Sequence, residues 1–107
     1  MKPDEKQAIE EFVRRVRELL GDKLLQIKLY GSKARGDDTE ESDIDIMLVL
    51  KDKNPDIRMK ITKIAVNVDS KYGTFTALNI FSEYEYEKNL YFEGPFITNV
   101  LKEGISL

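Results

Sequence analysis

The feature that most constrains the fold is a pair of short apolar runs, each bounded by glycine or polar residues. Leu24–Tyr30 forms the first run, between Gly21-Asp22 and Gly31, and Ile44–Leu50 forms the second. Apolar runs this short, with turn signals at their ends, are typical of partly or fully buried strands. We therefore expect two strands of one sheet, the first of which leads directly into a glycine turn.

Helical patterns surround these runs. From Pro3 to Leu20 apolar residues recur at helical spacing before Gly21 stops the helix. Asn54-Pro55 marks the start of a second helix that closes at Tyr72-Gly73, because Asn favours the cap and Pro the first turn. The remaining expected elements are a third strand over Thr74–Phe81, a short helix opened by the capping-box spacing of Ser82 to Glu85, and a last helix over Pro95–Glu103.

This order of elements predicts an α+β fold in which a small mixed sheet is packed against helices. With 107 residues, 41% apolar and 35% charged, the chain suits a single domain spanning residues 1–107. The absence of cysteine and histidine excludes disulfides, Ser-His-Asp triads and the usual zinc sites. A net charge of -3 argues against strong nucleic-acid binding, and no apolar stretch is long enough for a membrane span, so we expect a cytoplasmic protein.

The glycine turn is the first candidate for chemistry. Gly31 lacks a Cβ, so a phosphate group can approach the main chain closely, and the Ser32 hydroxyl adds a neutral donor. Lys33 and Arg35 follow as candidate cationic partners of a polyphosphate. Taken alone, Gly-Ser after a strand is also what an ordinary tight turn contains.

Two aspartates at the start of the second strand are the other candidate. Asp43 and Asp45 are two residues apart, so on a strand both carboxylates lie on one side, with Cα atoms about 6.5 to 7 Å apart. Like charges beside apolar neighbours repel unless a cation lies between them, and oxygen ligands favour magnesium or manganese. The alternative is that Ser42-Asp43 merely ends the acidic loop Asp37–Glu41 and caps a neighbouring element.

The combination of turn and aspartates closely resembles the signature of the DNA polymerase β-like nucleotidyltransferase superfamily. More narrowly, Tyr30–Asp37 and Ser42–Ile46 resemble the minimal nucleotidyltransferases, the small proteins of HEPN/MNT toxin–antitoxin pairs. The similarity extends over nearly the whole chain, including Asn99–Ile105. It implies a fold like the palm of polymerase β.

The resemblance also implies roles for these residues. Gly31 and Ser32 would hold the triphosphate of an NTP, with ATP as the expected donor, and Asp43 and Asp45 would bind the metal ions that activate it. Such enzymes transfer a nucleoside monophosphate to a hydroxyl and release pyrophosphate. In the toxin–antitoxin pairs the acceptor is a tyrosine of the HEPN toxin, and the antitoxin can also neutralise the toxin by binding it. In so small a chain, the acceptor is expected from a partner or from a second subunit of a homo-oligomer.

The sequence departs from the superfamily pattern at one position. A third carboxylate usually lies on a later strand, but Thr74–Phe81 contains neither Asp nor Glu, so that Ala77 or Asn79 takes its place. Asp69 and Glu83 could substitute, although each is expected to be an ordinary surface carboxylate. Nucleotide and metal binding are therefore expected, whereas the efficiency of transfer stays open. A pure binding module and a structural domain with a vestigial motif are the alternatives.

Aromatic residues gather late in the chain. They could line a protein interface, where tyrosine is enriched, but we expect most of them to pack in the core and to dock the last helices. The residues are Tyr84, Tyr86, Tyr91, Phe92 and Phe96.

Overall fold

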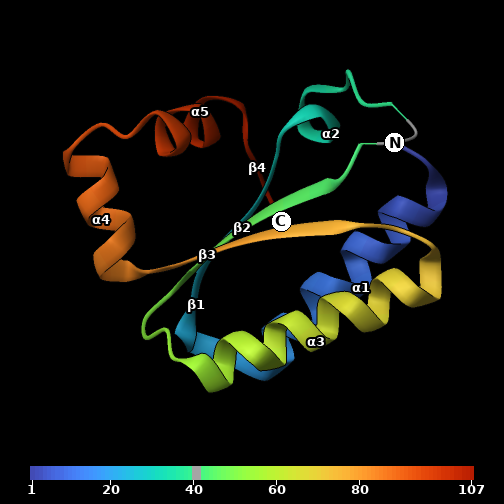
Figure 1. The fold of residues 1–107 in the computed structure, drawn as a ribbon, viewed down its shortest axis with the longest axis horizontal. Coiled ribbons are helices and arrows are strands. Elements are labelled where there is room, and N and C mark those ends of the chain that lie inside the picture. The colour runs from blue at the N-terminus through green and yellow to red at the C-terminus, as the bar shows by residue number, and fades with distance from the viewer. Residues whose placement is uncertain (40–41) are drawn as a thin grey trace.

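The protein is described by a computed structural model that covers residues 1–39 and 42–107. Its elements are α1 (Pro3–Leu20), β1 (Leu24–Tyr30), α2 (Ser32–Arg35), β2 (Ile44–Leu50), α3 (Pro55–Tyr72), β3 (Thr76–Ser82), α4 (Glu83–Tyr91), α5 (Pro95–Glu103) and β4 (Ile105–Ser106), with a short 3-10 turn over Gly21–Lys23. The strands form one four-stranded sheet in the order β3-β2-β1-β4 (Figure 1). The predicted α+β class and the mixed sheet are confirmed, because β1 pairs antiparallel with β2 and β4 while β2 and β3 run parallel.

The helix ends follow the local signals in the sequence. The side chain of Asn54 caps α3 by accepting a hydrogen bond from the backbone N–H of Ile57 at 2.9 Å. Gly73 closes that helix in the left-handed conformation, with φ of +68°. Ser82 and Glu85 form the predicted capping box at the start of α4. These ends were predictable because each depends only on residues within one turn of helix.

Two features differ from the prediction. The third strand begins at Thr76 rather than Thr74, because the Asp69 carboxylate accepts hydrogen bonds from the side chain of Thr74 and the backbone N–H of Thr76 and ties this segment to the end of α3. Strand β4 was not predicted. Its two residues, Ile105 and Ser106, add to the edge of β1 opposite Leu29 and Lys28, and so short a strand leaves no periodic pattern.

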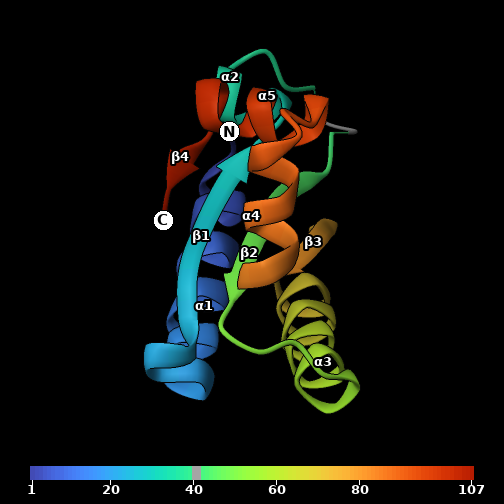
Figure 2. The same cartoon turned by 90° about the vertical axis from the view of Figure 1, so that its left-hand side faces the viewer.

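The two faces of the sheet carry different helices. Alternate residues of β2, from Ile44 to Leu50, pack against α1 and α3, which lie below the sheet in Figure 1. We call this the back face. Met47 and Val49 point to the opposite, front face, where they pack against Tyr86 of α4 and against α5 (Figures 1 and 2). Because α4 and α5 cover only part of the front face, β2 is fully buried from Ile46 onwards, whereas Asp43 is exposed and Asp45 half-buried.

The late aromatic residues divide into two groups. Tyr86 and Phe96 pack in the front-face core, as predicted. The same prediction is wrong for Tyr84, Tyr91 and Phe92, whose exposed fractions are 72%, 81% and 68%. Among the described residues, no helix is both long and apolar enough to cross a membrane.

Candidate active site

The turn after β1 brings the glycine and the aspartate together. Gly31 has φ of +77°, a conformation that favours glycine, and its carbonyl accepts hydrogen bonds from the N–H groups of Ala34 and Arg35, both at 3.1 Å. A Cβ on Gly31 would collide with Oδ2 of Asp45. The backbone at Gly31 therefore lies directly against the Asp45 carboxylate, and any larger residue would have to displace one of them.

The neighbouring strands define the surroundings of Asp45. In the antiparallel pair it lies opposite Tyr30, and in the parallel pair it lies opposite Ala77. Alternation along β2 places Asp45 on the front face with Met47. Partial burial raises the pKa of Asp45, the charge of Asp43 raises it further, and Arg35 and Lys33 only partly offset these effects. The pair of carboxylates is thus short of positive charge.

These residues fit a divalent metal ion with oxygen ligands. Asp43 and Asp45 provide two carboxylates, and among the described residues no group of three His, Cys, Asp or Glu side chains that could hold a metal is formed. Magnesium commonly binds to one or two carboxylates together with water and substrate phosphates. The predicted magnesium or manganese site therefore stays a prediction in which the substrate completes the coordination.

The strand register shows what stands in place of the third carboxylate. Ala77 lies beside Asp45 on β3, and Asn79 lies one step further along the same face, opposite Met47. The side-chain N–H of Asn79 donates a hydrogen bond to the hydroxyl of Tyr30, with an N–O distance of 2.6 Å. An amide cannot act as a base near neutral pH, so β3 offers no base beside Asp45.

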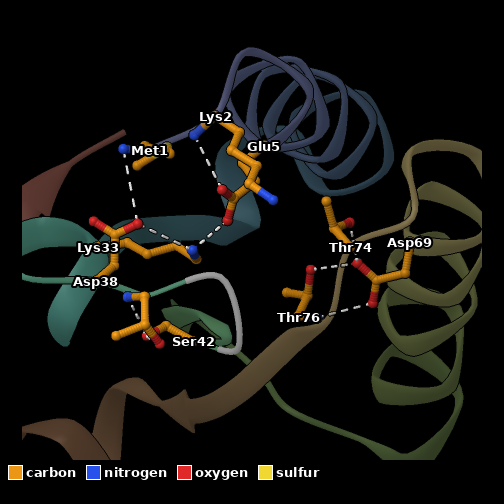
Figure 3. A network of polar contacts seen from close by, with 10 residues as sticks. Met1, Lys2, Glu5, Lys33, Asp38, Ser42, Asp69, Thr74 and Thr76 are labelled. Carbon is orange, nitrogen blue, oxygen red and sulfur yellow. Dashed lines mark hydrogen bonds and ion pairs between the residues drawn. The ribbon is translucent and has the colours of Figure 1, made fainter.

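Neither Asp69 nor Glu83 replaces the missing carboxylate beside Asp45. Asp69 accepts hydrogen bonds from the hydroxyls of Thr74 and Thr76, at 2.7 and 2.8 Å, and from the Thr76 backbone at 2.9 Å (Figure 3). Its role is to hold the connection from α3 to β3. Glu83 is exposed and follows the far end of β3, roughly 16 Å along the strand from Ala77. The prediction of an ordinary surface carboxylate thus fits Glu83 but is wrong for Asp69, which is half-buried and accepts three hydrogen bonds.

The two predicted cationic residues differ in their surroundings. Lys33 is buried, with 4% of its surface exposed, and its ammonium forms ion pairs with Glu5 and, at 3.3 Å, with Asp38 (Figure 3). Burial alone would lower the pKa of Lys33, but hydrogen bonds to both carboxylates raise it overall. Lys33 therefore connects α1 to α2 and its following loop. We expect it to support the turn rather than to contact phosphate.

Arg35 lies at the surface. Its guanidinium pairs with Asp37 and with Glu103 of α5, both at 3.2 Å, and 42% of the side chain is exposed. Exposed pairs of this kind contribute little to stability and exchange partners readily. Arg35 can therefore turn towards an anion bound at Gly31 and Ser32, as the sequence predicts.

Sequence reasoning missed three residues of this region. Tyr30 was seen only as part of a motif, yet its hydroxyl lies among the front-face residues beside Asp45, and burial is the main reason why its pKa is raised. Asp38 was noted only as part of the acidic loop Asp37–Glu41, and Glu5 was not considered. The position of Tyr30 immediately before the glycine turn is a local signal that could have identified it, whereas nothing local pairs Glu5 with Lys33.

A cavity of about 560 Å³ lies beside the site. It is bounded by the start of α1, by the turn from α3 to β3 and by Ser42 and Asp43, but not by Gly31 or Ser32. The Ser42 hydroxyl accepts a hydrogen bond from the backbone N–H of Thr39 at 2.9 Å. Glu40 and Glu41 of the predicted acidic loop lie outside the described residues. The volume suits a small ligand next to Asp43.

Comparison with known proteins identifies the class. A family model described as nucleotidyltransferase domain matches residues 9–103, so the chain belongs to the nucleotidyltransferase domain family. Two relatives from Methanocaldococcus jannaschii are named as candidate protein adenylyltransferases. One is 38% identical over 102 residues, covering 94% of this chain and 95% of its own, and the other is 35% identical over 101 residues, covering 92% and 94%.

Solved structures share the fold. A candidate nucleotidyltransferase from Sulfolobus solfataricus matches with a TM-score of 0.53 and 22% identity, over 99% of this chain and 86% of that one. A toxin–antitoxin crystallised with AMP-PNP matches with a TM-score of 0.58 and 21% identity, over 91% and 70%. The MntA-HpeT toxin–antitoxin matches with a TM-score of 0.56 and 22% identity, over 92% and 70%. The resemblance to minimal nucleotidyltransferases is confirmed.

Proposed function

We propose that this protein transfers AMP from ATP to a hydroxyl of a partner protein, in a reaction that requires magnesium. The observation that carries the proposal is the contact between Gly31 and the Asp45 carboxylate. It joins the turn suited to phosphates and the carboxylates suited to a cation in one continuous surface. Family membership supports nucleotidyl transfer, and the names of the two relatives support a protein as acceptor.

Each residue has a role in this scheme. Gly31 and Ser32 hold the β- and γ-phosphates, assisted by Arg35, and Asp43 and Asp45 hold the divalent ion. When bound, the ion neutralises negative charge around the α-phosphate. The acceptor oxygen forms a bond to the α-phosphorus while the bond from phosphorus to the bridging oxygen breaks, and pyrophosphate leaves with that electron pair. The acceptor proton passes to water, because Ala77 stands where a base could lie.

We further propose that the acceptor is a tyrosine of a HEPN-type toxin. The toxin–antitoxin structures with the same fold support this partner. We also propose that the reaction takes place in the cytoplasm, where ATP is available. The exposed aromatic residues Tyr84, Tyr91 and Phe92 offer a surface of the kind that protein interfaces favour. A second subunit of the same chain is the other possible source of the acceptor.

The replacement of the third carboxylate by Ala77 favours one alternative function. Loss of a metal ligand and base can lower transfer roughly 10²-fold to 10⁴-fold, so the protein could act as an antitoxin by contact while retaining nucleotide binding. Both functions require the partner protein, but only AMP transfer requires Asp43 and Asp45.

Labelled ATP, magnesium and the product of the neighbouring gene test the proposal. We expect label on the neighbouring protein, and we expect none with the Asp43→Asn variant. If the two proteins form a complex without label, and Asp43→Asn still forms it, the protein acts by binding and not by AMP transfer. If magnesium and ATP also fail to raise the melting temperature, nucleotide binding is excluded as well.

A further inference from the structure

We propose that Tyr30 is a further catalytic residue, whose phenolic O–H donates a hydrogen bond to a non-bridging oxygen of the α-phosphate during transfer. Asn79 is the positioning residue that holds the phenol in place. This inference rests on the proposed function, because it assigns a role within the same site. It concerns a side chain that the metal and phosphate contacts described above leave unused.

The sheet places the phenol beside the carboxylates. Tyr30 lies on β1 and Asn79 on β3, and β2 runs between them, so the hydrogen bond of 2.6 Å spans the middle strand on the front face. On β2, Asp45 is opposite Tyr30 and Met47 is opposite Asn79. The Tyr30 side chain therefore crosses β2 between Asp45 and Met47, on the front face of the sheet.

The hydrogen bond leaves the phenol able to donate. In this contact the Asn79 amide is the donor and the Tyr30 oxygen is the acceptor. A tyrosine hydroxyl carries one hydrogen and can accept as well, so its hydrogen remains for a second partner. Tyr30 is half-buried and Asn79 is exposed, which leaves this end of the phenol accessible to a substrate that binds over Asp45.

Aromatic packing restricts the ring. Phe96 of α5 contacts it edge to face, with a centroid separation of 5.1 Å, and Phe81 of β3 lies behind Phe96 at 5.9 Å. Met47 is fully buried beneath this group. The hydroxyl is thus held at one place by contacts at both ends of the side chain. A donor fixed before the reaction stabilises developing charge without reorganisation.

This arrangement has a chemical consequence at the position of the absent carboxylate. In phosphoryl transfer the non-bridging oxygens carry the negative charge of the transition state. Ala77 contributes no group towards them, whereas the Tyr30 hydroxyl, hydrogen-bonded to Asn79, lies on the same face one step along the sheet. A neutral donor there assists the transfer by stabilising charge, although it cannot replace the base.

The test compares Tyr30→Phe with the unmodified protein in the labelling reaction with the partner. We expect a roughly 10-fold to 100-fold lower kcat, with KM for ATP and the ATP-induced rise in melting temperature changed less than about twofold. Asn79→Ala is expected to lower kcat by a smaller factor. Tyr86→Phe is the matched control, because Tyr86 is buried on the same face but packs further along β2.

A sulfur substitution identifies the atom that receives the hydrogen bond. Sulfur accepts hydrogen bonds poorly, so one of the two diastereomers of ATPαS should slow the unmodified protein more than it slows Tyr30→Phe. If Tyr30→Phe and the unmodified protein transfer label at equal rates and show the same sulfur effects, the role of Tyr30 is contradicted, while the proposed function still stands. If the unmodified protein transfers no label, the proposed function fails and the inference fails with it.

Discussion

Two clusters of charged residues flank the glycine turn, and they are built on opposite principles. In the first cluster, Lys33 lies buried between Glu5 and Asp38, so that opposite charges satisfy one another inside the protein. In the second, Asp43 and Asp45 place like charges on one face with little compensation. The first arrangement is complete without a ligand, whereas the second is not.

The pKa directions express this difference. Burial alone would raise the pKa of Glu5, but the hydrogen bond from Lys33 lowers it overall. For Asp45, burial and the neighbouring charge of Asp43 act in the same direction, and its pKa is raised. Ionised Glu5 therefore stabilises the fold, while ionised Asp45 costs stability. Charged residues that lower the stability of the fold are typical of binding and catalytic sites.

Removal of an uncompensated carboxylate should produce the largest effect, and it should fall on activity. Asp45→Asn is expected to lower transfer by at least roughly 10³-fold, because several kcal/mol of transition-state stabilisation are lost. The free energy of unfolding without ligand should stay equal or rise slightly. Labelling kinetics and urea unfolding measure the two quantities. A substantial loss of stability would contradict the distinction between the clusters.

Disruption of the compensated cluster should act on stability instead. Lys33→Met removes the ammonium that Glu5 and Asp38 share, while the N-terminal ammonium of Met1 stays 3.7 Å from Asp38, and we expect the free energy of unfolding to fall by about 2 to 4 kcal/mol. Urea unfolding followed by circular dichroism gives the value. Lys60→Met is the control, since its pair with Asp56 is exposed and should contribute less than about 0.5 kcal/mol. Equal effects of the two substitutions would show that burial of Lys33 does not matter.

The contact between the turn and the second cluster can be separated from backbone strain. Gly31→Ala and Gly36→Ala both place alanine at positive φ, which costs roughly 1 to 2 kcal/mol, but only the Cβ at position 31 meets Asp45. Gly36 is in the left-handed helical region, whereas Gly31, with φ of +77° and ψ of −160°, is in a region that essentially only glycine adopts, so we expect Gly31→Ala to lose more stability than Gly36→Ala. Only Gly31→Ala should also lose the rise in melting temperature caused by ATP and magnesium. If Gly31→Ala keeps this rise in melting temperature, the contact between Gly31 and Asp45 is not needed for binding ATP and magnesium.

The pH dependence of stability should give the smallest effect, with opposite signs for the two clusters. Because the folded-state pKa of Glu5 is lowered from 4.5, its contribution is present above that pH and is lost as pH falls through the folded value. The raised pKa of Asp45 makes its own contribution fall as pH rises above 3.8. Glu5→Gln should flatten the acid limb of stability between about pH 3 and 5, and Asp45→Asn should steepen it. Superimposable profiles from urea unfolding across this range would contradict both assignments.

Local patterns were sufficient for most of the fold. The caps at Asn54 and Ser82 and the strand ending at Tyr30 depend on neighbouring residues alone, so the sequence predicted them. Strand β4 and the exposure of Tyr91 and Phe92 depend on which surfaces the rest of the chain leaves uncovered. Spacing along one segment carries no information about such coverage.

The sequence alone determined the order of elements and the presence of Gly31, Ser32, Asp43 and Asp45 at the ends of two strands, because turn chemistry and alternation are local properties. The tertiary structure decided the rest. It directed Lys33 into an ion-pair cluster with Glu5, set Ala77 rather than Asn79 beside Asp45, and brought Tyr30 across β2 to Asn79. These partners are far apart in the chain, and only the register of the sheet and the packing of α1 determine which side chains meet.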